Sequence, residues 1–575
     1  MVQGLSKFLY VRLRFVFYLY DFFKNLSFSF YPLLVACFFI IPLFTLLYLA
    51  FFVDDPFYEY ELWLHVATVT LPDYLVNSLL LILLTGGLAL IWGIISAWIL
   101  ARYHFTFSRF FSWAVVLPFA IPSYIMAYAY TDFFDYSGPV QMALRTLFSF
   151  TSPKDYYFPE IRSIYGCAFV LSLNLYPYLY LFSRTSFLEQ PEELTQTAKL
   201  FGLKAWQRFQ SIVFPLSRPA VIIGICIVFM ETLSDFVTVE YFSVQTLSLG
   251  FYNTWINMND IISASRIALI TIAIILAVMF FEKTARINQK QYVLVSGSSM
   301  SKTTKLRGFS AFFAIAFLSF PFLLGFLFPL IFISYYALPQ FLSSLNVELF
   351  FTIFRSVAIA FFVVVFSLSL SFFLLSASRV AREKGWLKIV YFFFSFGYSL
   401  PGIVLALGVL TWISKLDNFL FDFFKDCCSL SWGLFFSQSG FSIVYAHVIR
   451  FSFVPLGLLM ASFGNISPEM DQAATLYGAS KKQVMRKIHL PLLRRSLITA
   501  GLIVFVDSIK EVPTTLILRP FDFETISTSL YGFIIDEAVE KAAFPSLIIL
   551  LLSLFPVMIL CRQITKRLDD SLDDH

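Results

Sequence analysis

Charged residues are scarce in this chain of 575 residues. Only 13% of the residues are charged, whereas 59% are hydrophobic and the mean hydropathy is +0.79. The single core of a water-soluble domain could not bury that much apolar surface. The composition therefore predicts a protein whose main solvent is the lipid bilayer.

Reactive side chains are also few and scattered. The six cysteines contain no CxxC pair, and the five histidines are dispersed. Cys427 and Cys428 are adjacent, which rarely allows an unstrained disulfide, and no histidine cluster accompanies them. No GxxxxGK[ST] phosphate loop occurs anywhere. We therefore expect no firm metal site, no catalytic centre, no nucleic-acid partner and no ATP site in this chain.

Long apolar runs fill the rest of the sequence. Runs of about 20 residues, the length that crosses a bilayer, favour helices over the shorter alternating strands of a barrel. We expect an all-α integral membrane protein with about twelve transmembrane helices. The expected spans are 31–53, 75–101, 110–131, 164–187, 214–237, 262–282, 309–336, 351–377, 387–413, 440–463, 493–516 and 543–562.

Basic residues lie on every second loop of this arrangement. The positive-inside rule then places both the N- and the C-terminus in the cytoplasm. No small-residue cleavage site follows the first apolar run, so we expect a retained helix and no removed signal peptide. Segment 283–308 is polar and basic, which predicts a cytoplasmic linker between halves 1–282 and 309–575.

An internal repeat relates the two halves. The segment from Pro191 to Gly202 is followed, thirteen residues after its glycine, by Pro215. A second segment ends at Gly478 and is followed by Pro491 at the same spacing, with an offset of 276 residues. Because each half begins on the same side and has six expected spans, the repeat is parallel, with its axis along the membrane normal.

Each repeated segment has the pattern of a helix, a glycine and a second helix. Ser467 precedes a proline and two acids, which favours a helix N-terminus. Gly478 is expected to end that helix in the left-handed conformation. Ser480 and Gln483 have capping-box spacing for the second helix, which Pro491 is expected to stop before the next span.

This pattern resembles the EAA loop of binding-protein-dependent ABC importer permeases. The matching positions are Ala198, Gly202 and Pro215 in the first loop and Ala474, Gly478 and Pro491 in the second. Gln196 and Gln472 stand where the family has glutamate. The resemblance implies a type I ABC importer permease fold, with coupling loops at about 188–215 and 464–491. It also implies two copies of a cytoplasmic ABC ATPase as partners, which would bind ATP and Mg, while this chain binds no cofactor.

Four carboxylates follow the loop prolines at matching positions. Glu231 and Asp507 each lie sixteen residues after the proline, and Asp235 and Glu511 each lie twenty after it. A spacing of four places each pair on one helix face, in the outer half of the span. There the acids could line a substrate path and act as transient ligands of a hard cation. Alternatively, they reach the outer water, and Lys510 merely neutralises Glu511.

Segments 230–239, 246–255 and 510–521 resemble the fused two-half permeases of ferric iron importers, and the similarity covers essentially the whole chain. The resemblance implies transport of iron(III) by alternating access, from a periplasmic binding protein to the cytoplasm, across the bacterial inner membrane. Related fused thiamine permeases share the Lys-Glu-x-Pro pattern seen from Lys510 to Pro513. Thiamine, polyamine or another small solute therefore remains an alternative cargo.

A gradient-driven secondary transporter is the alternative from another class. Such proteins also have twelve helices and a parallel repeat. This alternative predicts transport without ATP, and it leaves the paired helix-glycine-helix loops unexplained.

Overall fold

Helices form nearly all of the described structure, as the long apolar runs predict. The computed structural model describes residues 37–53, 60–188, 190, 197–287, 304–341, 345–381, 385–428, 433–464 and 466–573. The only strands in this part of the chain are β1 (Tyr103–His104) and β2 (Thr304–Lys305), which pair in parallel. This pair attaches the end of the expected linker to the first half, and residues 288–303 of that linker lie outside the described residues.

The helices of the first half follow the expected spans closely at most positions. In chain order they are Cys37–Phe51, α2 (Tyr60–His65), η1 (Val66–Thr70), α3 (Leu71–Arg102), α4 (Ser108–Ala114), η2 (Leu117–Ala120), α5 (Ser123–Phe134), α6 (Pro139–Phe148), η3 (Pro153–Asp155), α7 (Ile164–Leu188), α9 (Ala205–Arg208), η4 (Phe209–Val213), α10 (Phe214–Ser234), α11 (Val237–Tyr241), α12 (Leu247–Tyr252), η5 (Asn253–Asn257) and α13 (Ile261–Ile287).

The second half repeats this order of long helices and short connections. Its helices are α14 (Phe309–Phe322), η6 (Leu323–Leu327), α15 (Phe328–Ala337), α17 (Val347–Ala381), α18 (Gly385–Ser399), α19 (Gly402–Cys428), α20 (Phe441–Phe451), α21 (Phe453–Gly464), α22 (Pro468–Leu476), α23 (Lys481–Val484), η7 (Met485–His489), α24 (Leu490–Leu492), α25 (Arg494–Lys510), α26 (Pro513–Leu518), α27 (Ile526–Ile535) and α28 (Val539–Asp573).

Fewer continuous membrane-crossing helices are present than the twelve expected. The described residues contain eight helices that are long and apolar enough, or ten if each of two bent pairs is one span. The expected span 110–131 is broken, because the chain bends by 88° between Ala120 and Ser123. The expected span 387–413 is likewise interrupted, between α18 and α19. Pro122 and Pro401 lie at these breaks, where the missing N–H and the ring oppose a continuous helix.

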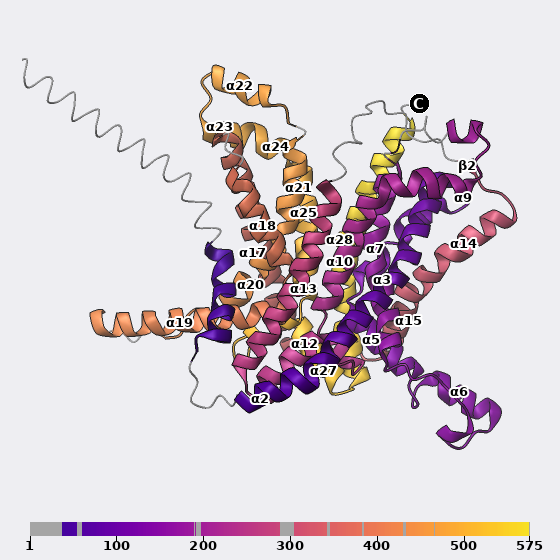
Figure 1. Cartoon of the computed structure of the whole chain (residues 1–575), viewed down its shortest axis with the longest axis horizontal. Coiled ribbons are helices and arrows are strands. Elements are labelled where there is room, and N and C mark those ends of the chain that lie inside the picture. Colours follow the sequence, from indigo (N-terminus) through magenta and orange to yellow (C-terminus); the bar gives the residue numbers. More distant parts are fainter. Residues whose placement is uncertain are drawn as a thin grey trace, which may run out of the picture.

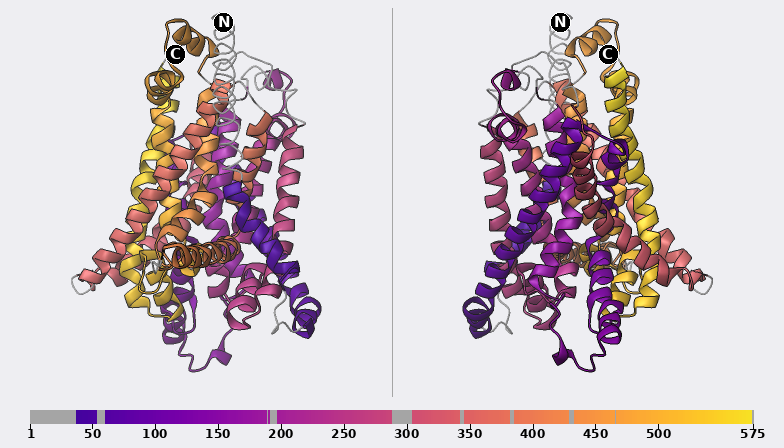
Figure 2. Two further views of the ribbon diagram at one scale, coloured as in Figure 1. Left: turned by 90° about the vertical axis from the view of Figure 1, so that its left-hand side faces the viewer. Right: turned by 90° about the vertical axis from the view of Figure 1, so that its right-hand side faces the viewer.

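The two repeated loops lie at the same end of the bundle. Figure 1 shows α22 and α9 at one end, with the last turns of α28, whereas α2, α12 and α27 lie at the other. In the turned views the two loops again occupy one end, on opposite sides of the molecule (Figure 2). We call these the α22 end and the α12 end.

The first helix of each half packs against the other half. In helix Cys37–Phe51, the Phe39 ring stacks on Phe394 at 4.2 Å between centroids, and Tyr445 Oη donates to the Phe38 carbonyl at 2.7 Å. In the other direction, the Trp92 ring stacks on Phe320 of α14 at 5.0 Å. This exchange packs one face of each first helix against the other half and joins the two halves into one core.

Close packing between α3 and α7 depends on Gly93. A Cβ at Gly93 would lie 2.6 Å from Leu179 Cβ, whereas a Cβ at Gly87 of the same helix would meet nothing within 4 Å. We predict that Gly93→Ala destabilises the protein by about 1–3 kcal/mol through overpacking, in spite of alanine's higher helix propensity. Gly87→Ala is the matched control, and it should be neutral or stabilising. Thermal unfolding in detergent checks this, and equal midpoints for the two variants would contradict it.

Candidate functional site

Each repeated loop is built around a left-handed glycine. Gly202 has φ +76° and Gly478 has φ +80°. In the first loop, Leu203 N donates to the Ala198 carbonyl at 3.1 Å, and in the second, Ala479 N donates to the Ala474 carbonyl at 3.0 Å. These six-residue hydrogen bonds define a Schellman motif, which ends a helix at a left-handed residue. The predicted conformation of Gly478 is confirmed, and the repeat extends to the backbone hydrogen bonds.

The second helix of each loop also begins in the same way. Ser480 N donates to Gln483 Oε1 at 2.8 Å, and Gln483 N donates back to Ser480 Oγ at 3.3 Å, so the predicted capping box is confirmed. In the first loop, Lys204 N donates to Gln207 Oε1 at 2.9 Å. The capping expected from Ser467 differs, since this residue is the N-cap of α22 but its side chain makes no cap hydrogen bond.

The loop prolines do not stop the second helices, which corrects the expectation for Pro491. The helix that contains Pro215 runs without a break from Trp206 to Ser234, and only Leu493 separates α24 from α25. A π-helical turn precedes each proline, at Phe209–Val213 and Met485–His489. The wider turn accommodates a residue that cannot donate a hydrogen bond, so the chain passes from loop to span as one element.

Large apolar side chains stand exposed beside both glycines. The exposed fractions are 88% for Leu200, 81% for Phe201, 88% for Leu476 and 92% for Tyr477. The two pairs correspond in the repeat, with the offset of 276 residues. Ala198 is buried and Gln472 is exposed, whereas Gln196 lies outside the described residues. Exposed apolar residues at matching tips mark a surface that another protein could cover.

Charged side chains connect the second loop to the neighbouring helices. Asp471 Oδ2 accepts from Arg379 Nε at 2.5 Å, and Asp471 Oδ1 lies 2.9 Å from His489 Nε2. Burial alone would raise the pKa of Asp471, but the hydrogen bonds from Arg379 and His489 outweigh it and hold the pKa below its usual value. Asp471 is therefore ionised at neutral pH and connects α22 to α17 and η7.

A cavity of about 140 Å³ lies between the two halves, and all four predicted carboxylates line it. They come from the outer ends of α10 and α25 and from the residues just after them. Two cations and several aromatic rings complete the lining. The lining residues used below are Phe119, Ser123, Tyr124, Asn174, Tyr178, Glu231, Asp235, Tyr398, Arg450, Asp507, Lys510 and Glu511.

Two of the four carboxylates are occupied by structural hydrogen bonds. Asp235 accepts from Ser123 Oγ at 2.7 Å, Thr238 N at 2.8 Å and Thr238 Oγ1 at 2.9 Å. Glu511 accepts from Arg450 Nη1 at 2.9 Å and from Thr514 Oγ1 at 2.7 Å. Each acid therefore ties the end of a long helix to the next short one.

The other two carboxylates are less restrained. Glu231 and Asp507 lie within α10 and α25, and neither forms an ion pair with any described residue. α10 ends at Ser234 and α25 ends at Lys510, earlier than the expected ends at 237 and 516, but Asp235 N still donates to the Glu231 carbonyl at 3.0 Å, so this pair lies one helical turn apart as predicted. Asp235 and Glu511 follow the helix ends in extended conformation. Glu231 shares a hydrogen bond with Tyr398, and Asp507 lies near Lys510, so these are the two carboxylates that no ion pair within 4 Å restrains.

Equivalent positions in the two halves make different contacts with Asp235 and Glu511. Ser123 and Gly402 each follow the proline at the break, and each begins a helix, α5 or α19. Ser123 donates to Asp235, whereas a Cβ at Gly402 would lie 2.3 Å from both Arg450 Nη1 and Glu511 Oε1. Glycine is therefore required where the second half places an ion pair instead of a hydroxyl.

The cavity has an excess of negative charge. Four acids and two bases line it, a formal net charge of −2. Arg450 was not among the residues predicted from the sequence, although a charge inside the apolar run 440–463 is the signal that marks functional positions in membrane proteins. The described residues contain no group of three or more His, Cys, Asp or Glu that could hold a metal ion. A cation could be attracted here without being tightly coordinated.

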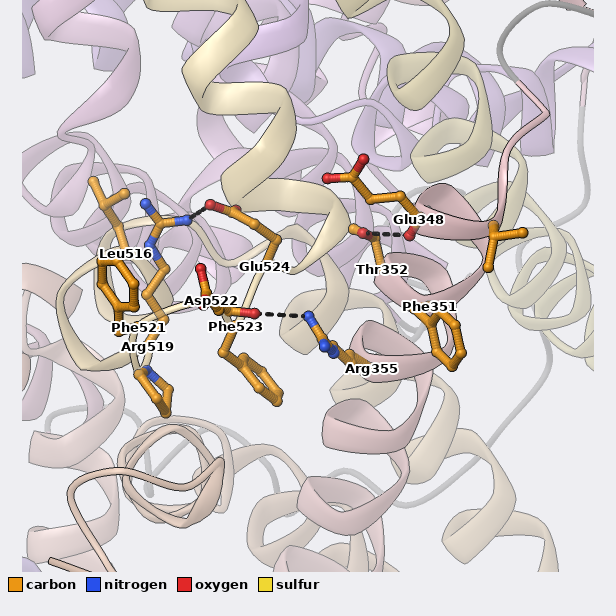
Figure 3. Close-up of a pocket in the computed structure, with 12 residues that line it drawn as sticks. Glu348, Phe351, Thr352, Arg355, Leu516, Arg519, Phe521, Asp522, Phe523 and Glu524 are labelled. Carbon is orange, nitrogen blue, oxygen red and sulfur yellow. Dashed lines mark hydrogen bonds and ion pairs between the residues drawn. The ribbon is translucent and has the colours of Figure 1, made fainter.

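A second hollow of about 730 Å³ lies at the α12 end, between the start of α17 and the segment 519–524. Arg519 pairs there with Glu524, and Arg355 Nη1 donates to the main-chain carbonyl of Asp522 at 3.0 Å (Figure 3). Phe521 on the same segment is 96% exposed. The hollow therefore combines charged groups with an exposed aromatic ring.

Residues 89–285 and 374–570 both match the family of binding-protein-dependent transport system inner membrane components. The two matched segments together cover more than half of the chain, and each contains one repeated loop and one carboxylate pair.

Several transport system permease proteins are similar to this chain. An Fe(3+)-transport system permease protein, FbpB 2 of Haemophilus influenzae, is 21% identical over 503 residues, 86% of this chain and 90% of that protein. A putative ferric transport system permease protein of the same organism, FbpB 1, is 25% identical over 46% of this chain and 42% of its own length. A probable sulfate transport system permease protein of Chlorokybus atmophyticus is 26% identical over 30% of this chain and 55% of its own.

The close approach at Gly402 generates a test of the buried ion pair. We predict that Gly402→Ala separates Arg450 from Glu511 and destabilises the protein by about 3 kcal/mol, because each charge is left without its partner. Gly457→Ala on α21 is the control, since its Cβ would meet no atom within 4 Å. Thermal unfolding of the two variants measures the effect. A Gly402→Ala protein as stable as the control would show that the ion pair contributes little.

Proposed function

The chain belongs to the family of binding-protein-dependent transport system inner membrane components, and from this premise we propose that it is the fused permease of an ATP-driven importer for a cation, iron(III). Two loops with the same Schellman motif and exposed apolar tips at one end of the bundle carry the proposal. Substrate would pass from a periplasmic binding protein to the cytoplasm by alternating access.

In this proposal the two loops bind the ATP-hydrolysing subunits. Each tip offers two large apolar side chains, and each loop continues directly into α10 or α25. Two matching tips fit two copies of an ABC ATPase, which would hold the ATP and Mg. ATP binding can drive the cycle only if the ATPase binds the two permease conformations with different affinity, and these contacts are where that difference would act.

Binding of the ATPase by the two loops also determines the orientation of the chain in the membrane. The α22 end, with the last turns of α28, faces the cytoplasm, as does the N-terminus. The α12 end faces the periplasm and receives the binding protein, for which the exposed Phe521 and the hollow beside it provide a contact surface.

The charge of the cavity supports a cation as cargo. A net charge of −2, with Glu231 and Asp507 free of ion pairs in the described structure, attracts a cation and repels an anion such as sulfate. Carboxylate oxygens suit hard cations. Both ferric permeases among the relatives are consistent with iron(III).

An organic cation such as thiamine is the second candidate. The rings of Phe119, Tyr124, Tyr178 and Tyr398 line the cavity together with the acids. Aromatic faces attract desolvated cations and stack on aromatic solutes, so the lining also fits a cation that carries a ring.

The cargo can be identified by stimulation of ATP hydrolysis. We expect the permease, reconstituted with its ATPase, to hydrolyse ATP faster when an iron(III)-loaded binding protein is added than with thiamine-, polyamine- or sulfate-loaded ones.

Glu231→Gln with Asp507→Asn should lower iron uptake by about tenfold or more, because the two unpaired charges are lost. Asp536→Asn at the α12 end is the charge control. Uptake that is unchanged in the double variant would remove these acids from the path.

The docking role of the loops can be tested without disturbing the fold. We predict that Leu476→Ser with Tyr477→Ser prevents the ATPase from co-purifying, because both side chains are almost fully exposed and contribute little to the permease core. Phe521→Ser, equally exposed at the α12 end, is the control and should leave the complex intact. Normal yield and normal coupling in the loop variant would refute docking, and transport without any ATPase would favour a gradient-driven transporter.

A further inference from the structure

Lys510 connects the two halves across the cavity. It is the last residue of α25, and its Nζ donates to the Phe119 carbonyl oxygen of η2 at 2.5 Å. The same ammonium lies 4.6 Å from the centre of the Phe119 ring. A single side chain of the second half therefore binds both the backbone and the ring of a residue in the first.

The repeat contains no equivalent of this cation in the first half. Ser234 occupies the position that corresponds to Lys510, at the end of α10. Phe119 corresponds to Tyr398, since each lies three residues before the proline at the break. Serine is too short to span the cavity, so only the second half provides a side chain that reaches across to the first.

The charges around Lys510 explain why a cation is needed there. Asp507 lies one turn earlier on α25, and Glu231, Asp235 and Glu511 line the same cavity. Of the two bases in the lining, Arg450 is paired with Glu511. Without Lys510 the cavity would hold four carboxylates against one base, and such like charges repel one another strongly in an apolar surrounding.

We propose that Lys510 is a tethered cation that holds the two halves together across the empty path and is displaced when a substrate cation arrives. The arriving charge replaces Lys510 among the carboxylates, so the bond to the Phe119 carbonyl can break as the halves separate. Lys510 then both keeps the empty path closed and selects for a positively charged cargo. The inference rests on the proposed function in requiring a cationic substrate.

The test uses the complete permease in liposomes, first without ATPase or binding protein. Leak is measured as quenching of trapped calcein by external Mn²⁺. We expect Lys510→Met to raise the leak about tenfold over the unmodified protein, and Lys510→Arg, which keeps the charge, to restore tightness. Lys541→Met removes an exposed cation of α28 and is the control, expected to leave the leak unchanged.

A charge-balanced variant separates the bond to Phe119 from the net charge of the cavity. Lys510→Met combined with Asp507→Asn restores the net charge but not the bond, so its leak should stay as high as that of Lys510→Met. A leak that falls back to that of the unmodified protein in the double variant, or that never rises in Lys510→Met, would overturn the inference.

A second readout distinguishes failure of this inference from failure of the proposed function. In the full complex, Lys510→Met should hydrolyse ATP at a high basal rate that the loaded binding protein stimulates less than it stimulates the unmodified complex. If the unmodified complex responds to a cation-loaded binding protein and Lys510→Met responds equally, only the role of Lys510 is wrong. If no cation-loaded binding protein stimulates the unmodified complex, the cargo assignment is wrong, and the proposal for Lys510 falls with it.

Discussion

A carboxylate that ends a helix inside an apolar bundle is costly unless it is paired or hydrogen-bonded, and the helix breaks at the centre of this molecule meet that requirement. Asp235 and Glu511 lie where α10 and α25 end, and each accepts hydrogen bonds from the first turn of the next short helix. Each acid also lies at the start of another helix, α5 or α19, through Ser123 or next to Gly402. The positive end of a helix dipole favours a carboxylate there. The long helices can therefore be broken at the cavity without exposing unsatisfied groups.

The two halves satisfy this requirement with different residues, and three equivalent positions differ together. Where the first half has Ser123, Asn174 and Ser234, the second has Gly402, Arg450 and Lys510. Asn174 Nδ2 donates to the Ile121 carbonyl at 2.6 Å, whereas Arg450 reaches the carboxylate because Gly402 leaves room for it. Both cations of the cavity thus come from one half. A fused chain can hold such an asymmetry, since each half evolves its own side of the path, whereas two identical subunits would place every charge twice.

Local features of the loops were predictable from the sequence because they depend on neighbouring residues. The left-handed Gly478 and the Ser480–Gln483 capping box follow from rules that operate within one turn of helix. Features that depend on the other half were not predictable in the same way. The exchange of first helices and the bond from Lys510 to Phe119 join residues far apart in the chain. The ends of α10 and α25 were placed too late in the expected spans, although Pro513 lies three residues after Lys510 and is typical of a helix end.

The continuity of α25 connects the loop to the cavity. The hydrogen bond between Asp471 and His489 connects α22 to η7, and the chain runs from η7 through the loop proline into α25. The seventeen residues of α25 form a rod of about 25 Å, and Lys510 lies at its far end. Asp471 also connects the loop to α17 through Arg379, so α17 and α25 move with the same loop. A rotation of this unit relative to the first half would change the distance from Lys510 Nζ to the Phe119 carbonyl oxygen, because that bond spans the halves at the cavity itself.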